Sequence, residues 1–248
     1  MSRVFATVGL IAASLGAQAV IVTQWNFNSN PPDSSTSTGS YAASVGTGTV
    51  SALNCTADFA NNGGALGTGS GDTTVADNTA LRTYNYPAQG TGSGTGGIQF
   101  TISTLGYGSL SLDFGRRHDA GSSRWIRVLA DAGSGFSTLA DIENPGTENN
   151  WIATSVNLSS FSNLNNKAAV TFRIVTIFGN VGSITGATGY ATTGNAGSGP
   201  GGSSYSVTNT SGKIRYEMLT VSGTAVPEPG TFLALGVGAL ALLRKRRS

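Results

Sequence analysis

The chain has 248 residues, enough for one large β domain or two small ones; 36 are glycine and only 10 % are charged, which is typical of many turns and short strands. Without the five basic residues near the two ends and Glu228, nine basic residues remain against eleven acidic ones, so the body offers no basic stripe to a nucleic-acid backbone. One cysteine and one histidine exclude an intramolecular disulfide and a zinc site built from several such side chains.

The N-terminus has the three parts of a secretory signal peptide. Arg3 supplies a positive charge, residues 4–15 are mainly apolar, and Ala17 and Ala19 form the A-x-A pattern of a cleavage site. We expect residues 1–19 to be a signal helix that is removed by cutting after Ala19, which leaves the mature chain outside the cytoplasm. The alternative is an ordinary buried helix over the same residues.

Alternating apolar and polar residues recur through the body of the chain. In GIQFTIST, for example, Ile98, Phe100 and Ile102 share one face. No segment has sustained helical periodicity with helix caps. The predicted strands cover residues 97–104, 109–115, 124–131, 151–158, 169–178 and 213–221. The pattern predicts an all-β domain over residues 20–225, an antiparallel β-sandwich of jelly-roll type. The Gly-rich stretches 60–97 and 179–204 are expected to be binding loops or linkers.

The residues best suited to bind a sugar lie on two segments. Trp125 and Arg127 share one strand face, close in sequence to Arg116 and Arg124, while Tyr84 and Tyr86 are predicted to form a second platform on a loop. An aromatic ring stacks on the apolar face of a sugar, and Arg, Asn and Asp hydrogen-bond to its hydroxyls. The alternatives are core packing for Trp125, and a solvated face or ion pairs for the arginines.

The sequence contains no recognisable set of catalytic residues. His118 and Asp119 are neighbours, and neighbours on a strand point to opposite faces, so we expect His118 to be a solvated loop residue. There is no G-x-S-x-G nucleophile elbow. Asp113 and Glu217 lie on polar strand faces, but their spacing does not show that they form the carboxylate pair of a glycosidase. We therefore expect no catalytic residue.

No organic cofactor is expected, and calcium is a secondary hypothesis. Two Gly-rich segments, DFANNGG and SGDTTVADN, carry hard oxygen ligands of the kind that calcium prefers. Ordinary turn chemistry explains the same residues equally well, and no EF-hand spacing is present. The candidate ligands are Asp58, Asn61, Asn62, Asp72, Asp77 and Asn78.

The C-terminus, residues 226–248, has three parts in a fixed order. It begins with Val226, Pro227, Glu228, Pro229 and Gly230 and ends with Arg244, Lys245, Arg246 and Arg247. Between these ends, residues 231–243 are apolar and would form a helix of about 20 Å, shorter than the roughly 30 Å of a bilayer core. The basic residues would hold the tail on the cytoplasmic side.

This arrangement resembles the PEP-CTERM sorting signal of Gram-negative bacteria. The resemblance implies that an exosortase recognises Pro227, Glu228 and Pro229, that the C-terminal helix holds the protein in the inner membrane before processing, and that the protein reaches the cell surface or the exopolysaccharide matrix. The alternative is a plain membrane anchor. The segments QWNFNS, GGIQFTISTLGYGSLSLDFGRR and RWIRVLADAGSGF also resemble surface β-sandwiches of PEP-CTERM proteins, which look similar to lectin-like jelly rolls.

These observations favour a non-enzymatic protein of the surface or biofilm matrix, with polysaccharide as its candidate ligand. The alternatives are a secreted glycan-active hydrolase or lyase, and a purely structural protein that assembles with itself.

Overall fold

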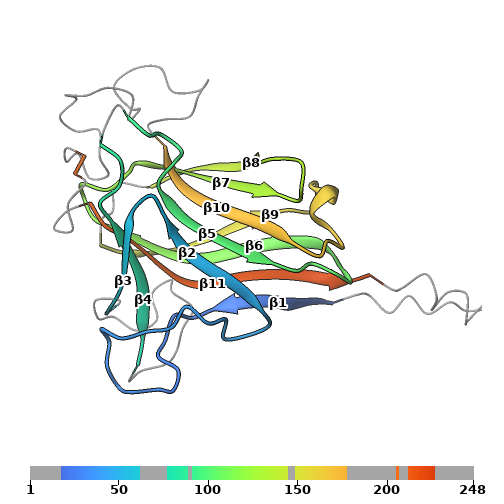
Figure 1. Cartoon of the computed structure of the whole chain (residues 1–248), viewed down its shortest axis with the longest axis horizontal. Coiled ribbons are helices and arrows are strands. Elements are labelled where there is room, and N and C mark those ends of the chain that lie inside the picture. The colour runs from blue at the N-terminus through green and yellow to red at the C-terminus, as the bar shows by residue number, and fades with distance from the viewer. Residues whose placement is uncertain are drawn as a thin grey trace, which may run out of the picture.

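Two antiparallel β-sheets pack face to face in the computed structural model (Figure 1). It describes residues 18–61, 77–88, 91–144, 149–177, 205–206 and 212–226. These residues contain one short 3-10 helix, η1 (Ser162–Leu164), and no α-helix. The strands are β1 (Ala19–Trp25), β2 (Gly48–Leu53), β3 (Thr56–Asn61), β4 (Thr79–Tyr84), β5 (Gly97–Ile102), β6 (Tyr107–His118), β7 (Trp125–Asp131), β8 (Ser137–Glu143), β9 (Trp151–Asn157), β10 (Val170–Ile177) and β11 (Ile214–Ala225).

Strands that follow one another in the chain mostly lie in different sheets. The six-stranded sheet has the order β3-β4-β11-β6-β9, with β1 also paired to β11, and the five-stranded sheet has the order β2-β5-β10-β7-β8. From β4 to β7 and from β8 to β11, each connection crosses from one sheet to the other, as in a jelly roll. The predicted antiparallel β-sandwich is therefore confirmed.

The core lies between the two sheets and is rich in aromatic side chains. Phe100 on β5 lies opposite Phe172 on β10, and their rings stack with centroids 5.1 Å apart. Trp25 at the end of β1 meets the Phe100 ring edge-on at 5.8 Å and is fully buried. Strand alternation explains this packing, because one face of each strand turns inward. The first strand is thus held in place by the core as well as by β11.

The six predicted strand segments are all found, and β10 is a central strand, as its mixed pattern predicted. The Gly-rich stretch 60–97 differs from the prediction, because it contains β4, which pairs with β3 and β11. Most of the stretch 179–204 lies outside the described residues. No helix in the described part of the chain is long and apolar enough to cross a membrane. The predicted signal helix and C-terminal helix fall outside that part.

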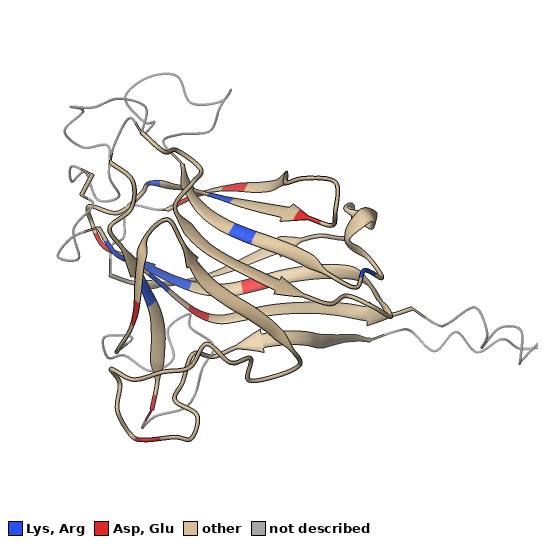
Figure 2. Ribbon diagram, in the orientation of Figure 1, with Lys and Arg blue, Asp and Glu red and all other residues tan. Residues whose placement is uncertain are grey.

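Two strands share one edge of β11. Its first residues pair with β4, and its later residues pair with β1. Between them the ladder to β6 contains a bulge at Met218, whose φ is +49°. A bulge shifts the pleat by one residue. Figure 2 shows few charged residues on either sheet, and several of the Lys and Arg positions gather at the end of the sandwich that lies away from the start of β1.

Candidate functional site

The outer face of the five-stranded sheet carries two aromatic rings and several hydrogen-bonding side chains. Along β7, Trp125 and Arg127 are half-buried on this outer face, while Ile126 and Val128 are fully buried in the core. The predicted alternation of β7 is confirmed. We name this surface the Trp125 face. It comprises Trp125, Arg127, Asp141, Gln99, Arg173 and Phe136.

An ion pair fixes the arginine beside Trp125. Arg127 and Asp141 lie directly opposite each other on β7 and β8. The guanidinium donates two hydrogen bonds to the carboxylate, from Nε to Oδ1 at 2.6 Å and from Nη2 to Oδ2 at 2.8 Å. Hydrogen bonding to Asp141 raises the pKa of Arg127. A second pair, Arg124 with Glu143 at 2.6 Å, flanks Trp125 on the other side.

The second aromatic ring of the face comes from the turn between β7 and β8. The guanidinium carbon of Arg173 lies 3.8 Å from the centroid of the Phe136 ring, and Phe136 is 37 % exposed. Arg173 also donates from Nε to Oε1 of Gln99 at 2.8 Å. Asp131 Oδ1 accepts three backbone N–H bonds from the turn, at 2.7 to 3.0 Å. The turn that presents Phe136 is therefore held by its own hydrogen bonds.

The two rings lie in different rows of the sheet. Trp125 pairs with Ile177, and Arg173, under Phe136, pairs with Leu129. These rows are four residues apart, which corresponds to about 13 Å along a strand. The Arg127–Asp141 pair lies in a row between the two rings, so the face can receive a flat, polyhydroxylated ligand that extends along β7.

The two tyrosines are not part of this face. Tyr84 ends β4 in the other sheet, where its ring lies 5.6 Å from the guanidinium carbon of Arg82 and its hydroxyl donates to Asp58 at 3.4 Å. Tyr86 is only 3 % exposed, and its hydroxyl shares a hydrogen bond with Thr83. Burial raises the pKa of Tyr86. The structure thus places the predicted platform residues apart, one on a surface and one in the core.

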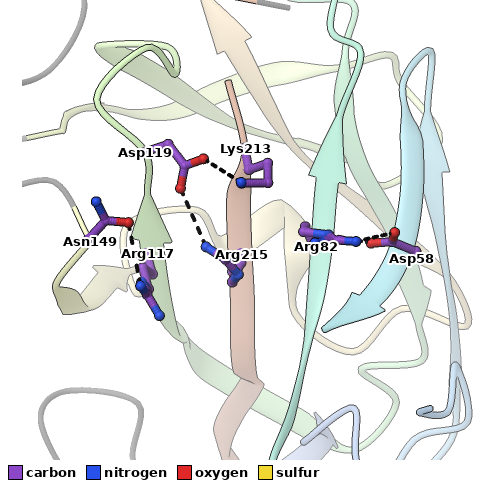
Figure 3. Close-up of polar contacts among 7 residues, drawn as sticks. All are labelled: Asp58, Arg82, Arg117, Asp119, Asn149, Lys213 and Arg215. Carbon is purple, nitrogen blue, oxygen red and sulfur yellow. Dashed lines mark hydrogen bonds and ion pairs between the residues drawn. The ribbon is translucent and has the colours of Figure 1, made fainter. Parts of the chain in front are cut away.

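A row of charged residues crosses the outer face of the six-stranded sheet. Its members are direct cross-strand partners on β3, β4, β11, β6 and β9, four charged residues and one tryptophan, and we name it the arginine row. Figure 3 shows its four charged members. The arginine row comprises Asp58, Arg82, Arg215, Arg117 and Trp151. Like charges that face each other across strands are destabilising. Two carboxylates offset them.

Asp58 and Asp119 hold the cations of the arginine row. Asp58 accepts from Arg82 Nε at 2.7 Å and Nη2 at 2.5 Å. Asp119 lies 3.0 Å from Lys213 Nζ and 3.5 Å from Arg215 Nη1. Burial lowers the pKa of Arg215, and the positive charge of nearby Arg117 lowers it further.

Asp119 is therefore an ion-pair partner on this sheet. His118 is fully buried at the end of β6, opposite Ile214, so the expectation of a solvated loop residue was wrong. Alternation along β6 continues to its last residue and turns His118 toward the core.

The two carboxylates weighed for glycosidase chemistry lie in different rows. Asp113 is opposite Thr220 and accepts from Ser111 Oγ at 3.0 Å. Glu217 is opposite Gly115 and is fully buried. The expectation that Glu217 lies on a polar strand face was wrong, because Glu217 lies beside the bulge at Met218, where the alternation of buried and exposed residues along β11 is interrupted.

The predicted signal peptide and the C-terminal sorting motif join the domain at neighbouring strand ends. Ala19 begins β1, and Val226 follows β11, where its N–H donates to the carbonyl of Gly106 at 2.8 Å. The remaining predicted residues lie outside the described part of the chain: Ala17, Pro227, Glu228, Pro229, Gly230, Arg244, Lys245, Arg246 and Arg247.

Residues 225–247 match the PEP-CTERM protein-sorting motif. No curated protein matches the chain in sequence. Among solved structures, a cyclase from Fischerella sp. is 10 % identical with a TM-score of 0.48 and aligns with 86 % of this chain and 100 % of its own. A variant of a family 29 carbohydrate-binding module is 10 % identical with a TM-score of 0.37, over 86 % and 99 %. The tandem CBM22 domains of Paenibacillus barcinonensis Xyn10C are 9 % identical with a TM-score of 0.39, over 71 % and 46 %.

The described residues define an all-β protein of the two-sheet sandwich class. The chain is a PEP-CTERM domain-containing protein, and its sorting motif implies export, processing by an exosortase and sorting to the cell surface.

Proposed function

We propose that this chain is a non-enzymatic protein of the cell surface or exopolysaccharide matrix of a Gram-negative bacterium, and that it binds polysaccharide through the Trp125 face. One observation carries the proposal. Trp125 and Phe136 lie on the same outer sheet face, with Arg127 in the row between them, fixed by Asp141, and Arg173 beneath Phe136, fixed by Gln99.

The chemistry of the Trp125 face suits a sugar chain. An aromatic ring covers the C–H face of a sugar, and this contact excludes water from apolar surface. Arg127 and Arg173 are already held by their neighbours, so little side-chain entropy is lost when a hydroxyl accepts a hydrogen bond from one of them. A rigid, flat face of this kind favours an extended polymer over a compact ligand.

The sorting motif supports the same function. A protein that reaches the cell surface meets polysaccharide at high local concentration, so even a weak contact with each sugar is effective along a chain with many repeats. The motif begins at Ala225, the last residue of β11, so it follows the folded domain directly. Removal of the tail would leave both sheets intact.

The test is cosedimentation of the full-length chain, kept in mild detergent, with exopolysaccharide purified from the producing cells. We expect binding, and we expect Trp125→Ala and Phe136→Ala each to weaken it about tenfold through loss of one stacking contact. Trp151→Ala is the matched control, because Trp151 is also a half-buried tryptophan at the start of a strand, but on the other sheet.

Three results would overturn the proposal. Release of sugar that is abolished by Asp113→Asn or Glu217→Gln would make the protein a glycan-active enzyme. Fibres that form with protein concentration and without binding would make it a self-assembling structural protein. Equal binding by the Trp125 and Trp151 variants would remove the Trp125 face from the site.

A further inference from the structure

Exposed apolar side chains gather at the end of the sandwich where β1 begins and β11 ends. Seven large hydrophobic side chains are exposed in the described part of the chain, and four of them lie at this end: Val20, Ile21, Leu105 and Val226. Single exposed apolar residues are ordinary, whereas a group of them marks a contact surface. We name these four residues the tip patch. Figure 2 shows few charged residues at this end of the molecule.

The tip patch is built around the end of β11. Val20 and Ile21 lie on β1, on one side of β11. Leu105 lies in the turn between β5 and β6, on the other side of β11. Val226 directly follows β11, and its N–H donates to the carbonyl of Gly106, next to Leu105, at 2.8 Å. This hydrogen bond fixes the point where the chain leaves the domain beside the Leu105 turn.

The turn presents Leu105 to solvent in a fixed geometry. The N–H of Tyr107 donates to the carbonyl of Thr104 at 3.0 Å, and Gly106, with a φ of +77°, takes the turn position that requires a positive φ. Thr104 is fully buried, and its Oγ1 donates to the carbonyl of Leu164 at 2.7 Å. Leu105 is 56 % exposed, the largest value among the seven side chains. A polar residue would suit this turn position equally well, so the fold alone does not explain the leucine.

The chain beyond Val226 brings this end close to a bilayer. Only residues 227–230 separate Val226 from the apolar run 231–243, and a chain of this length spans at most about 18 Å. The headgroup layer on each side of a bilayer is about 5 to 7 Å thick. With the apolar run in the bilayer, as the sequence predicts, Val226 lies no more than about 13 Å outside the headgroups. The predicted signal peptide joins the domain at the same end, through β1.

We propose that the tip patch rests on the outer surface of the lipid bilayer while the C-terminal tail is inserted, with Leu105 and Val226 at the boundary between headgroups and acyl chains. The proposal rests on the predicted insertion of the tail and not on polysaccharide binding. Apolar side chains at a membrane interface are removed from water by the acyl chains. Lys167 is exposed beside the turn, where its carbonyl accepts from the N–H of Thr104 at 2.8 Å, and its ammonium group suits the phosphate of a headgroup.

A bilayer suits the tip patch better than a second copy of the chain. Two copies that docked tip to tip would enclose both tails between the domains, away from any membrane. A bilayer at the tip also leaves Trp125 accessible. Trp125 lies opposite Ile177, the last residue of β10, whereas Val170, the first residue of β10, lies opposite Ile102, close to the Leu105 turn. Trp125 is therefore about 23 Å farther from the membrane along β10.

The test places one environment-sensitive fluorophore on the full-length chain inserted in phosphatidylcholine vesicles. In a Cys55→Ser background, the label is attached to Leu105→Cys. Ala88→Cys is the matched control, because Ala88 is also exposed but follows β4, whose last residues pair with the first residues of β11. Lipids that carry a nitroxide on the acyl chain should quench the label at position 105 at least about threefold more than the label at position 88. A water-soluble quencher should give the reverse order.

A second experiment separates contact from tethering. With the label on Val226→Cys, the change Leu105→Asp should increase quenching from water at least about twofold, because a carboxylate resists burial among acyl chains while the tail still holds the domain nearby. Val45→Asp is the matched control, since Val45 is an exposed apolar residue outside the tip patch, and it should change nothing.

Four results would overturn the proposal. The chain could fail to float with the vesicles, or the lipid nitroxides could quench positions 105 and 88 alike. Leu105→Asp could leave the label at position 226 as shielded as before, which would show that the tail alone sets its distance from the bilayer. Shielding at position 105 that persists without vesicles and grows with protein concentration would assign the tip patch to a second copy of the chain.

Discussion

Ala19 on β1 lies directly opposite Thr224 on β11. The first is the residue after which the signal peptide is expected to be cut, and the second lies just before the sorting motif at residues 225–247. The predicted signal peptide and the sorting motif therefore join the domain at the same end of the sandwich, where β1 begins and β11 ends (Figure 1). Cutting after Ala19 would remove only the first residue of β1 and leave its other pairs with β11.

The pairing of β1 with β11 can be trapped by a disulfide. Ile21 is 44 % exposed and lies opposite Ser222. Directly opposite residues on antiparallel strands have Cα atoms about 4.5 to 5.5 Å apart, within the range that a disulfide spans. The double variant Ile21→Cys, Ser222→Cys should cross-link under mild oxidation and raise the unfolding midpoint. Non-reducing electrophoresis of the protease-cut chain would detect the link.

A matched pair tests whether this link reports strand order. Ser111 on β6 lies opposite Ser222 on the far side of β11. Ile21 and Ser111 are therefore separated by two strand spacings, about 9.6 Å, which is too far for a disulfide. The variant Ile21→Cys, Ser111→Cys should stay reduced. Equal cross-linking of both pairs would contradict the strand order.

The arginine row depends on Asp119. Replacing Asp119 by Asn leaves Lys213 and Arg215 without their carboxylate while Arg82 and Arg117 still face Arg215. Because the Asp119 side chain is only 9 % exposed, we expect the free energy of unfolding to fall by about 2 to 3 kcal/mol. Added salt should restore part of the loss by screening the like charges. Urea unfolding at low and high ionic strength measures both effects.

Asp58→Asn is the control for that experiment. The Asp58–Arg82 pair has side chains 36 % and 26 % exposed, so its loss should cost no more than about 1 kcal/mol. If Asp58→Asn proves as costly as Asp119→Asn, burial does not set the strength of these pairs.

Alternation explains why half of the strands could be predicted. GIQFTIST and RWIRVLAD carry apolar residues at every second position, and both form strands with one buried face. The strands β3 and β4, with the sequences TADFAN and TALRTY, have no such run, and β4 lies inside a Gly-rich stretch. Their pairing with each other and with β11 is a long-range property that local pattern does not contain.

The candidate site, like the set of strands, could be predicted only in part. Trp125 and Arg127 share a face because they are two residues apart on one strand, which spacing alone predicts. Phe136 joins them only through the β7–β8 turn and Arg173 on another strand, so no local signal indicated it. Tyr86 is likewise two residues from Tyr84. Strand β4 ends at Tyr84, however, and the ring of Tyr86 lies in the core.

Arg116 joins the two sheets through hydrogen bonds inside the domain. Its guanidinium donates to Asn144 Oδ1 at 2.9 Å, Thr154 Oγ1 at 2.8 Å and the carbonyl of Glu143 at 3.1 Å. Burial lowers the pKa of Arg116 to about 10, so it stays charged at neutral pH. Lysine cannot reach all three acceptors with the same planar fork, so Arg116→Lys should cost about 2 to 4 kcal/mol in urea unfolding.

The pH dependence of that loss follows from the pKa. Burial depresses the pKa of Arg116 in the folded state, so only above about pH 10 does the unfolded state bind more protons. The cost of Arg116→Lys should therefore be constant across the neutral range. Arg124→Lys is the control, because the Arg124–Glu143 pair is more exposed and should be worth less than about 1 kcal/mol. A loss that changes steeply near neutral pH would show that another titrating group contributes.

The single cysteine should be slow to react in the folded protein. Cys55 is half-buried, its thiol donates to the carbonyl of Gly97 at 3.2 Å, and burial raises its pKa to about 11. The thiolate is the nucleophile, and at this pKa its population near pH 8 is on the order of a hundredfold lower than for a free cysteine. A chromogenic thiol reagent should therefore react at least about a hundredfold more slowly with the native chain than with the chain in denaturant.

The variant Cys55→Ser, Leu105→Cys places one thiol at a position that is 56 % exposed and should react at nearly the same rate in both states. Native and denatured rates for Cys55 within tenfold of each other would mean that the strand ends around it open readily, and Cys55 would then be available to pair between chains after export.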